Sequence, residues 1–447
     1  MEFRLRTPPE WGPDPVPPEK RILRGFDFFV LWFSLGVGLL VMIAGMLLPL
    51  LLGLSLAESA LVILVGSVVG SLMLAAAGPI GSRYGVPSMV SLRPVLGRVG
   101  SYVPTALNVL QLVGWTSFEI LIMGEAASDL VRAPQGGLVN FAFLGVFGVF
   151  CGLLALGGPL LVVRQWLEKF GIWLVIGSTV WLSYALFTTP GYGWGGFTSP
   201  TANLLLGLDL VIVLPISWWP LLSDYNRFAR RPREAAAGTA VGYTLANIWF
   251  FLLGAGMFLI LGQASPSLAI LGLGFGGVAL LFILADETDN GFANIYSTAV
   301  SAQNLRARWP QRTLVLVSTA IGIVLAGILT AMGGIAAALN YEFFLLLIGG
   351  FFVPLLGVLA SDWFLVRRGR YDPAEFGTGA PRVRWAALVS WAAGIVVYFL
   401  LSGISLFNLG AVFPGIGGSI PSFLVAAGLH AVIARALDAR VTSTSTS

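Results

Sequence analysis

The chain has 447 residues and a formal net charge of +4, and its composition is strongly apolar. Hydrophobic residues make up 57% and charged residues 10%, against roughly 25% charged residues in soluble domains, and the mean hydropathy is +0.88. This composition excludes a soluble globular protein and indicates a membrane protein. A single cysteine, Cys151, excludes an intrachain disulfide and a multi-cysteine metal site.

The apolar segments have the length of membrane-spanning helices, which need about 20 residues to cross about 30 Å. They lack the alternation with period two that is expected of barrel strands. We therefore expect an all-α polytopic membrane protein with twelve transmembrane helices. In chain order the segments are 28–51, 57–77, 103–127, 140–158, 170–189, 205–225, 238–262, 269–300, 313–333, 337–366, 384–403 and 411–435.

The basic residues between these segments predict the orientation. With a cytoplasmic N-terminus, every Lys and Arg except Arg132 falls on the cytoplasmic side. Positive charge in short loops marks that side, so we expect a multi-pass protein of the plasma (inner) membrane with both termini in the cytoplasm. The pI near 9.4 then reflects these loops, and no nucleic-acid partner is expected. The one histidine, His430, is expected to be structural or interfacial.

The eighth segment carries an unusual density of polar groups at its centre. A charge at the bilayer midplane costs several kcal/mol, and such residues mark ion or substrate paths by default. We expect this part of the segment to handle a polar ligand or an ion, although Asp286 and Glu287 have a structural alternative, which is to pair with donors in the first or third segment. The polar residues are Asp286, Glu287, Thr288, Asp289, Asn290 and Asn294.

Two other segments contain helix-breaking residues near their midpoints. The first carries Gly36-Val37-Gly38, and the sixth carries Pro215-Ile216-Ser217. Gly weakens a helix interior and Pro removes a hydrogen bond there. Either break alone is typical of close helix packing, but interrupted segments at matching positions of two halves point to a transporter site between inverted repeats.

The third segment adds Trp115 and Glu119, which lie four residues apart on one helix face. An indole can stack on a flat ring while a carboxylate accepts its N–H groups. The alternative for Trp115 is packing or an interfacial position. Glu119 needs a partner, because no Lys or Arg lies in the interior of a membrane segment. Trp218 and Trp219 offer a second aromatic surface with the same alternative.

Two charged motifs resemble a known family. Residues 223–230, SDYNRFAR, and 361–369, SDWFLVRRG, end the sixth and tenth segments. They resemble the signatures of the first family of nucleobase:cation symporters, as do Leu31-Trp32-Phe33 and Gly114-Trp115. Residues 285–301 resemble the branch of cytosine or hydroxymethylpyrimidine permeases.

The resemblance implies a LeuT-type core of five plus five helices in inverted repeats, with broken helices 1 and 6 and two peripheral helices. It implies a secondary active transporter, not an enzyme, that imports a small planar nitrogen heterocycle with Na⁺ or H⁺ by alternating access and needs no cofactor beyond that ion. The expected organisation is a cytoplasmic arm (1–24), first repeat (25–190), second repeat (204–368), helices 11 and 12 (384–436) and a disordered tail (437–447).

The resemblance also assigns residues. Trp115 matches the tryptophan that stacks on the ring, Asn294 matches an asparagine that bonds ring heteroatoms, and Glu119 stands where many relatives carry Gln. A carboxylate only accepts hydrogen bonds, so a ligand rich in N–H donors would suit Glu119 better. The remaining expected substrate residues are Gly38, Ser217, Trp218 and Asn290, and the implied cation ligands are Ser34, Val37, Ala285, Thr288 and Asp289.

Three other functions agree less well with these features. A LeuT-type carrier for another solute, such as an amino acid, shares the expected fold but not the charged motifs. A channel would need repeated pore-lining elements, which are not visible in the sequence. A membrane enzyme would need a nucleophile or a metal cluster, and one His with one Cys leave little to build it from.

Overall fold

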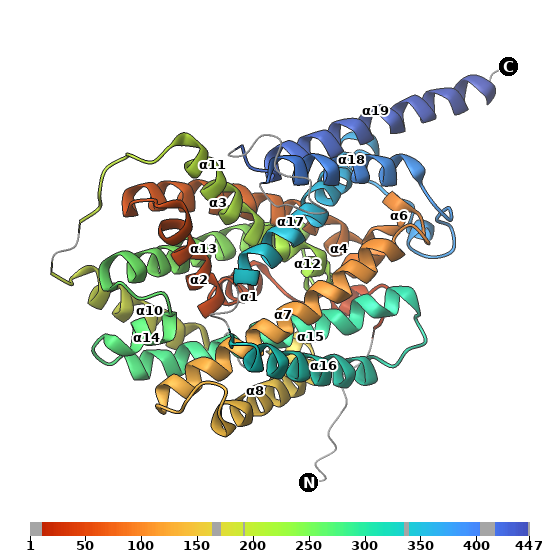
Figure 1. Ribbon diagram of the computed structural model, residues 1–447. Coiled ribbons are helices and arrows are strands. Elements are labelled where there is room, and N and C mark those ends of the chain that lie inside the picture. Colours follow the sequence, from red (N-terminus) through yellow and green to blue (C-terminus); the bar gives the residue numbers. More distant parts are fainter. Residues whose placement is uncertain (1–10, 163–170, 191–192, 335–338, 403–415, 446–447) are drawn as a thin grey trace, which may run out of the picture.

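The computed structural model describes residues 11–162, 171–190, 193–334, 339–402 and 416–445, which are helical apart from turns, loops and one isolated bridge (Figure 1). Eight helices are long and apolar enough to span a membrane, and the bent pair of α1 (Gly25–Ser34) and α2 (Leu39–Leu52) counts as a ninth span within these residues. The shorter apolar helices α10 (Ile172–Phe187) and α18 (Trp385–Leu401) coincide with two further expected segments. The all-helical, polytopic prediction is confirmed. The count of twelve helices and the inverted repeat stay predictions.

The first half of the chain contains the broken first helix and the long helix α7. Its helices are α1 (Gly25–Ser34), α2 (Leu39–Leu52), α3 (Leu56–Ala76), α4 (Gly78–Tyr84), α5 (Ser88–Ser91), α6 (Arg93–Leu96), α7 (Tyr102–Leu130), α8 (Leu138–Gly157), α9 (Pro159–Leu161) and α10 (Ile172–Phe187).

The second half repeats the pattern of long apolar helices and ends in a helix that diverges from the bundle (Figure 1). Its helices are α11 (Thr201–Ser217), α12 (Trp219–Asn226), α13 (Pro232–Leu261), α14 (Pro266–Gly272), α15 (Gly276–Leu305), α16 (Gln311–Ala331), α17 (Leu339–Ala360), a π-helical turn (Ser361–Val366), α18 (Trp385–Leu401) and α19 (Ser419–Ser445). Helix α19 therefore extends through residues 437–445, which were expected to belong to a disordered tail.

The break in the first span lies at the glycines expected from the sequence. Helix α1 ends at Ser34, a tight turn bonds the Val37 N–H to the Ser34 carbonyl at 2.9 Å, and α2 starts at Leu39 with a bend of 60°. A Cβ on Gly36 would lie 2.8 Å from the Cβ of Ala246 in α13. Glycine is therefore needed here for the close packing of the break against α13.

The sixth span is interrupted without the large bend seen in the first span. Pro215 lies inside α11, and the interruption falls at Trp218, between α11 and α12. The two helices still form one apolar span, Thr201–Asn226. The expected break at 215–217 is therefore displaced by one residue, because the helix continues for nearly a turn beyond the proline.

The eighth expected segment, 269–300, needs a correction at both ends. Its first residues belong to the separate short helix α14, and Phe275 adopts a left-handed conformation (φ 56°) before α15 starts at Gly276. Helix α15 then continues to Leu305 and packs against α7, α8 and α16. This position in the middle of the bundle lets the polar residues of α15 avoid lipid.

Candidate functional site

The polar residues of α15 are buried inside the protein. Every residue from Asp286 to Asn304 is buried, and the carboxylate-bearing ones are at most 1% exposed. Buried charges require partners, protons or ions. Among the described residues, no group of three or more His, Cys, Asp or Glu side chains is arranged to hold a metal ion.

A small, nearly closed pocket, with a cavity volume of about 10 Å³, lies where the break in the first span faces α7, α15 and Trp218. It brings together five of the seven expected substrate residues, and its lining from the described part of the chain contains no Lys, Arg or His. The expected members are Gly38, Trp115, Glu119, Trp218 and Asn290, and the others are Leu35, Leu40, Val41, Leu214, Glu287 and Tyr341.

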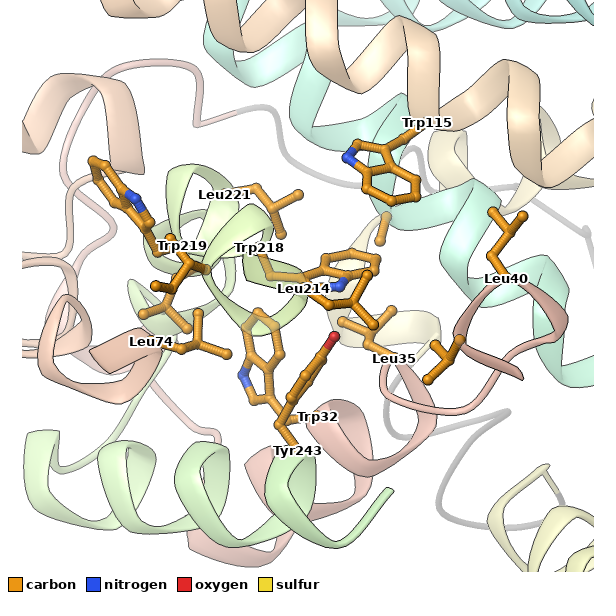
Figure 2. Close-up of a cluster of buried hydrophobic side chains, with 14 of the residues drawn as sticks. Trp32, Leu35, Leu40, Leu74, Trp115, Leu214, Trp218, Trp219, Leu221 and Tyr243 are labelled. Carbon is orange, nitrogen blue, oxygen red and sulfur yellow. The ribbon is translucent and has the colours of Figure 1, made fainter. Parts of the chain in front are cut away.

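Two tryptophans supply aromatic surface to this pocket. Trp115 of α7 meets Tyr341 of α17 edge-on, with ring centroids 6.0 Å apart, and Trp218 meets Trp32 edge-on at 6.3 Å. Figure 2 shows Trp115 and Trp218 near Leu35 and Leu214, whereas Trp219 points away from them. Trp219 donates instead to the carbonyl of Phe352, so of the two adjacent tryptophans only Trp218 serves the pocket.

Three polar side chains face the same space. Glu287 accepts the backbone N–H of Leu39, at 3.2 Å to Oε1 and 3.1 Å to Oε2, and its carboxyl group meets that of Glu119. Asn290 Nδ2 donates to the Val37 carbonyl at 3.0 Å. Glu119 Oε2 and Asn290 Oδ1 are buried without a partner among the residues that the structure describes, and unmade hydrogen bonds of this kind are costly unless a ligand satisfies them.

Two of the residues expected to hold a cation, Ser34 and Asp289, lie close together at the C-terminal end of α1. Ser34 Oγ donates to Asp286 Oδ1 at 2.7 Å, which agrees with the expectation that Asp286 pairs with a donor in the first span. Asp289 lies beside Ser34 and Asp286, and neither of its carboxylate oxygens has a hydrogen-bond partner among the described residues. The carbonyl of Ala285 accepts the hydroxyl of Thr288 at 2.7 Å.

Two expected substrate residues do not line the pocket. Ser217 donates to the Leu214 carbonyl at 2.6 Å, and Asn294 lies one turn beyond Asn290, with no partner for its Nδ2 in the described ranges. Of the six pocket residues that were not expected, two are polar, Glu287 and Tyr341. Glu287 could have been found from its spacing of three from Asn290, which places both on one helix face, whereas no local signal marks Tyr341.

The two charged motifs make hydrogen bonds that connect helix ends to neighbouring segments, and neither motif lines the pocket. Asp224 Oδ1 accepts the Ser88 N–H at 2.9 Å, and the fully buried Arg227 donates to the Gly12 carbonyl at 2.8 Å and the Tyr296 hydroxyl at 2.7 Å.

In the second motif, Asp362 accepts the Tyr371 hydroxyl at 2.7 Å and lies 3.1 Å from His430 Nε2. His430 therefore links α19 to the end of the tenth segment, the structural place expected for it.

The sequence is similar to those of known permeases. Residues 15–417 match the family model for permeases for cytosine/purines, uracil, thiamine and allantoin. The chain is 23% identical to the hydantoin permease of Microbacterium maritypicum, with 85% of this chain and 82% of the relative covered. It is 25% identical to the cytosine permease of Escherichia coli (strain K12), covering 79% and 80%.

Solved structures show the same fold. Mhp1, a nucleobase-cation-symport-1 family transporter in a closed conformation with bromovinylhydantoin bound, matches with a TM-score of 0.79 at 20% identity, covering 97% of this chain and 96% of that one. A Na⁺-coupled sialic acid symporter matches with a TM-score of 0.63 at 13% identity, covering 96% and 93%. The relatives are permeases rather than enzymes. The chain belongs to the family of cytosine, purine, uracil, thiamine and allantoin permeases.

Proposed function

We propose that this protein is a secondary transporter that imports a small planar nitrogen heterocycle, such as a nucleobase or a hydroxymethylpyrimidine-like ring, together with Na⁺ or H⁺. The observation that carries the proposal is the pocket itself. Trp115 and Trp218 give it flat apolar surface, and Glu119 and Asn290 give it acceptors that no described residue satisfies. A planar ring with N–H groups at its edge satisfies both features at once.

The position of the pocket supports alternating access. Its walls come from the broken first span, from the interruption at Trp218, and from α7, α15 and α17. Helix breaks at matching positions are the points at which two halves of a transporter can rock around a central site. The relatives named above are permeases, and the matching Mhp1 structures were determined in closed and inward-facing conformations.

The residues expected to bind the coupling cation are suited to a monovalent ion or a proton. Ser34 and Thr288 have hydroxyl oxygens, Val37 and Ala285 have backbone carbonyls that already accept from Asn290 and Thr288, and both carboxylate oxygens of Asp289 lack a partner among the described residues. Such hard oxygen donors suit Na⁺, and Asp289 equally suits a coupling proton. A bound cation would offset the buried charge of Asp289 and so favour the state in which these helices are packed together.

Uptake by purified protein in proteoliposomes tests the proposal. Radiolabelled cytosine, adenine, uracil and hydantoin would be compared with an amino acid, with and without inward Na⁺ and H⁺ gradients. We expect uptake of at least one heterocycle and its stimulation by one gradient. Uptake of the amino acid alone would favour the other LeuT-type carrier, and uptake insensitive to both gradients would contradict cation coupling.

A further inference from the structure

A row of polar side chains continues along α15 from the pocket towards the end of the bundle that is expected to face the cytoplasm. Its members recur at alternating spacings of four and three residues, which places them on the same helix face as the pocket residue Asn290. All of them are buried, with at most 3% of the residue exposed. The row consists of Asn290, Asn294, Ser297, Ser301 and Asn304.

Helix α7 presents polar side chains to this row. Gln111 and Asn108 lie about one and two turns from the pocket residue Trp115, towards the same end of the bundle. Gln111 Nε2 donates to Asn108 Oδ1 at 2.7 Å, and Asn108 Nδ2 donates to Ser301 Oγ at 2.9 Å. We call the α15 row together with Asn108 and Gln111 the polar seam. It runs between α7 and α15 from the pocket towards the expected cytoplasmic end.

Asn108 joins three helices across the polar seam. Besides Ser301 of α15, its Nδ2 reaches the carbonyl of Pro220 in α12 at 3.3 Å, and the side chain is fully buried. The pocket is lined by residues of α7 and α15 and by Trp218, which directly precedes α12. The bonds of Asn108 therefore connect elements that must separate before a ligand can leave the pocket in this direction.

The polar seam contains atoms that the closed packing leaves unsatisfied. Asn294 Nδ2 and Gln111 Oε1 are buried and have no hydrogen-bond partner among the residues that the structure describes. Polar side chains that only hold membrane helices together are expected to satisfy one another, because an unmade buried hydrogen bond costs free energy. Water or a polar ligand passing between the helices would satisfy these atoms.

We propose that the polar seam is the cytoplasmic exit path of the transported heterocycle and that Asn108 is the positioning residue that keeps it closed. This inference rests on the proposed function. The pocket is nearly closed in this structure, and the bonds of Asn108 hold α7 against α12 and α15 in that state. Loss of these bonds shifts the equilibrium towards the state in which the helices have separated on the cytoplasmic side.

The reactivity of a cysteine placed inside the polar seam tests this inference. In a full-length protein with Cys151→Ser, the probe is the cysteine introduced by Ser297→Cys, at a position that is fully buried. A membrane-impermeant methanethiosulfonate reagent is applied to inside-out vesicles, which expose the cytoplasmic face. We expect Asn108→Ala to raise the rate of modification roughly two- to tenfold, the factor that corresponds to the net contribution of one hydrogen bond to the closed state.

Two further variants separate the role of Asn108 from general stability. Ser301→Ala removes the acceptor of one bond with a small change of side chain. It should raise the rate in the same direction, and it covers the case in which Asn108→Ala does not fold. Asn140→Ala is the matched control, because Asn140 is equally buried and donates to Ser128 Oγ at 3.0 Å, near the opposite end of α7. This control should leave the rate unchanged.

An unchanged rate in both folded variants, Asn108→Ala and Ser301→Ala, would overturn the role of Asn108. An equal increase in Asn140→Ala would overturn it as well, because the polar seam would then respond to any loosening of the bundle. The measurement requires no heterocycle, so its failure leaves the proposed function standing. The proposed function fails separately, if the wild-type protein takes up no heterocycle in proteoliposomes.

Discussion

Replacement of Trp115 by alanine tests whether this tryptophan is a ligand surface. Trp115 is 6% exposed, lines the pocket and makes edge contacts with Tyr341 at 6.0 Å and Phe344 at 5.3 Å. Base–aromatic stacking contributes about 1–3 kcal/mol by alanine substitution, so the dissociation constant should rise roughly 5- to 150-fold. Trp115→Phe keeps a smaller ring in place and should lose less.

Equilibrium binding of the transported heterocycle to purified variants measures this effect, and thermal unfolding checks each fold. The alanine variant also loses the packing of Trp115 against Phe344, so a control for packing is needed. Trp219→Phe is the matched control: Trp219 is equally buried but points away from the pocket and donates to Phe352 (Figure 2). It should lower stability without weakening binding. A folded Trp115→Ala protein with wild-type affinity would refute the stacking argument.

The other predictions concern the cation, the chain break and the topology. Asp289→Asn should abolish gradient-driven accumulation while some binding and exchange remain, because losing the cation site removes the coupling free energy; full accumulation would show that this carboxylate is structural. Gly38→Ala should crowd the Glu287 carboxylate, which would lie 3.1 Å from the added Cβ, and should weaken ligand binding by about 1–3 kcal/mol. The variant should still fold, because the backbone at Gly38 is extended. Unchanged affinity would show that the pocket wall accommodates the added methyl group. After Cys151→Ser, a cysteine placed at Arg306 should resist labelling from outside sealed cells, and ready labelling would contradict a cytoplasmic loop.

The position of the site could be predicted from local chemistry. A run of carboxylates and amides in an apolar segment can be tolerated only if it faces the protein interior, so Asp286 and Asn290 marked α15 as a lining helix. Gly36 and Gly38 marked the break of the first span for an equally local reason, because glycine weakens a helix interior.

The details of the pocket depend on packing between distant segments. Tyr341 reaches the pocket from α17 and donates to the Leu40 carbonyl, 301 residues away in the chain, and no local pattern distinguishes it from other apolar-helix tyrosines. Ser217 was displaced for a different reason. The interruption falls at Trp218, one residue beyond the expected break at 215–217, so Ser217 still belongs to helix α11 and donates to the Leu214 carbonyl.

Steady-state accumulation of a heterocycle inside proteoliposomes tests the central claim most directly. The account predicts an internal concentration above the external one when an inward Na⁺ or H⁺ gradient is imposed, and a return to equal concentrations when an ionophore dissipates that gradient. Equal concentrations on both sides under every gradient, with the protein folded and binding its ligand, would contradict a cation-coupled transporter.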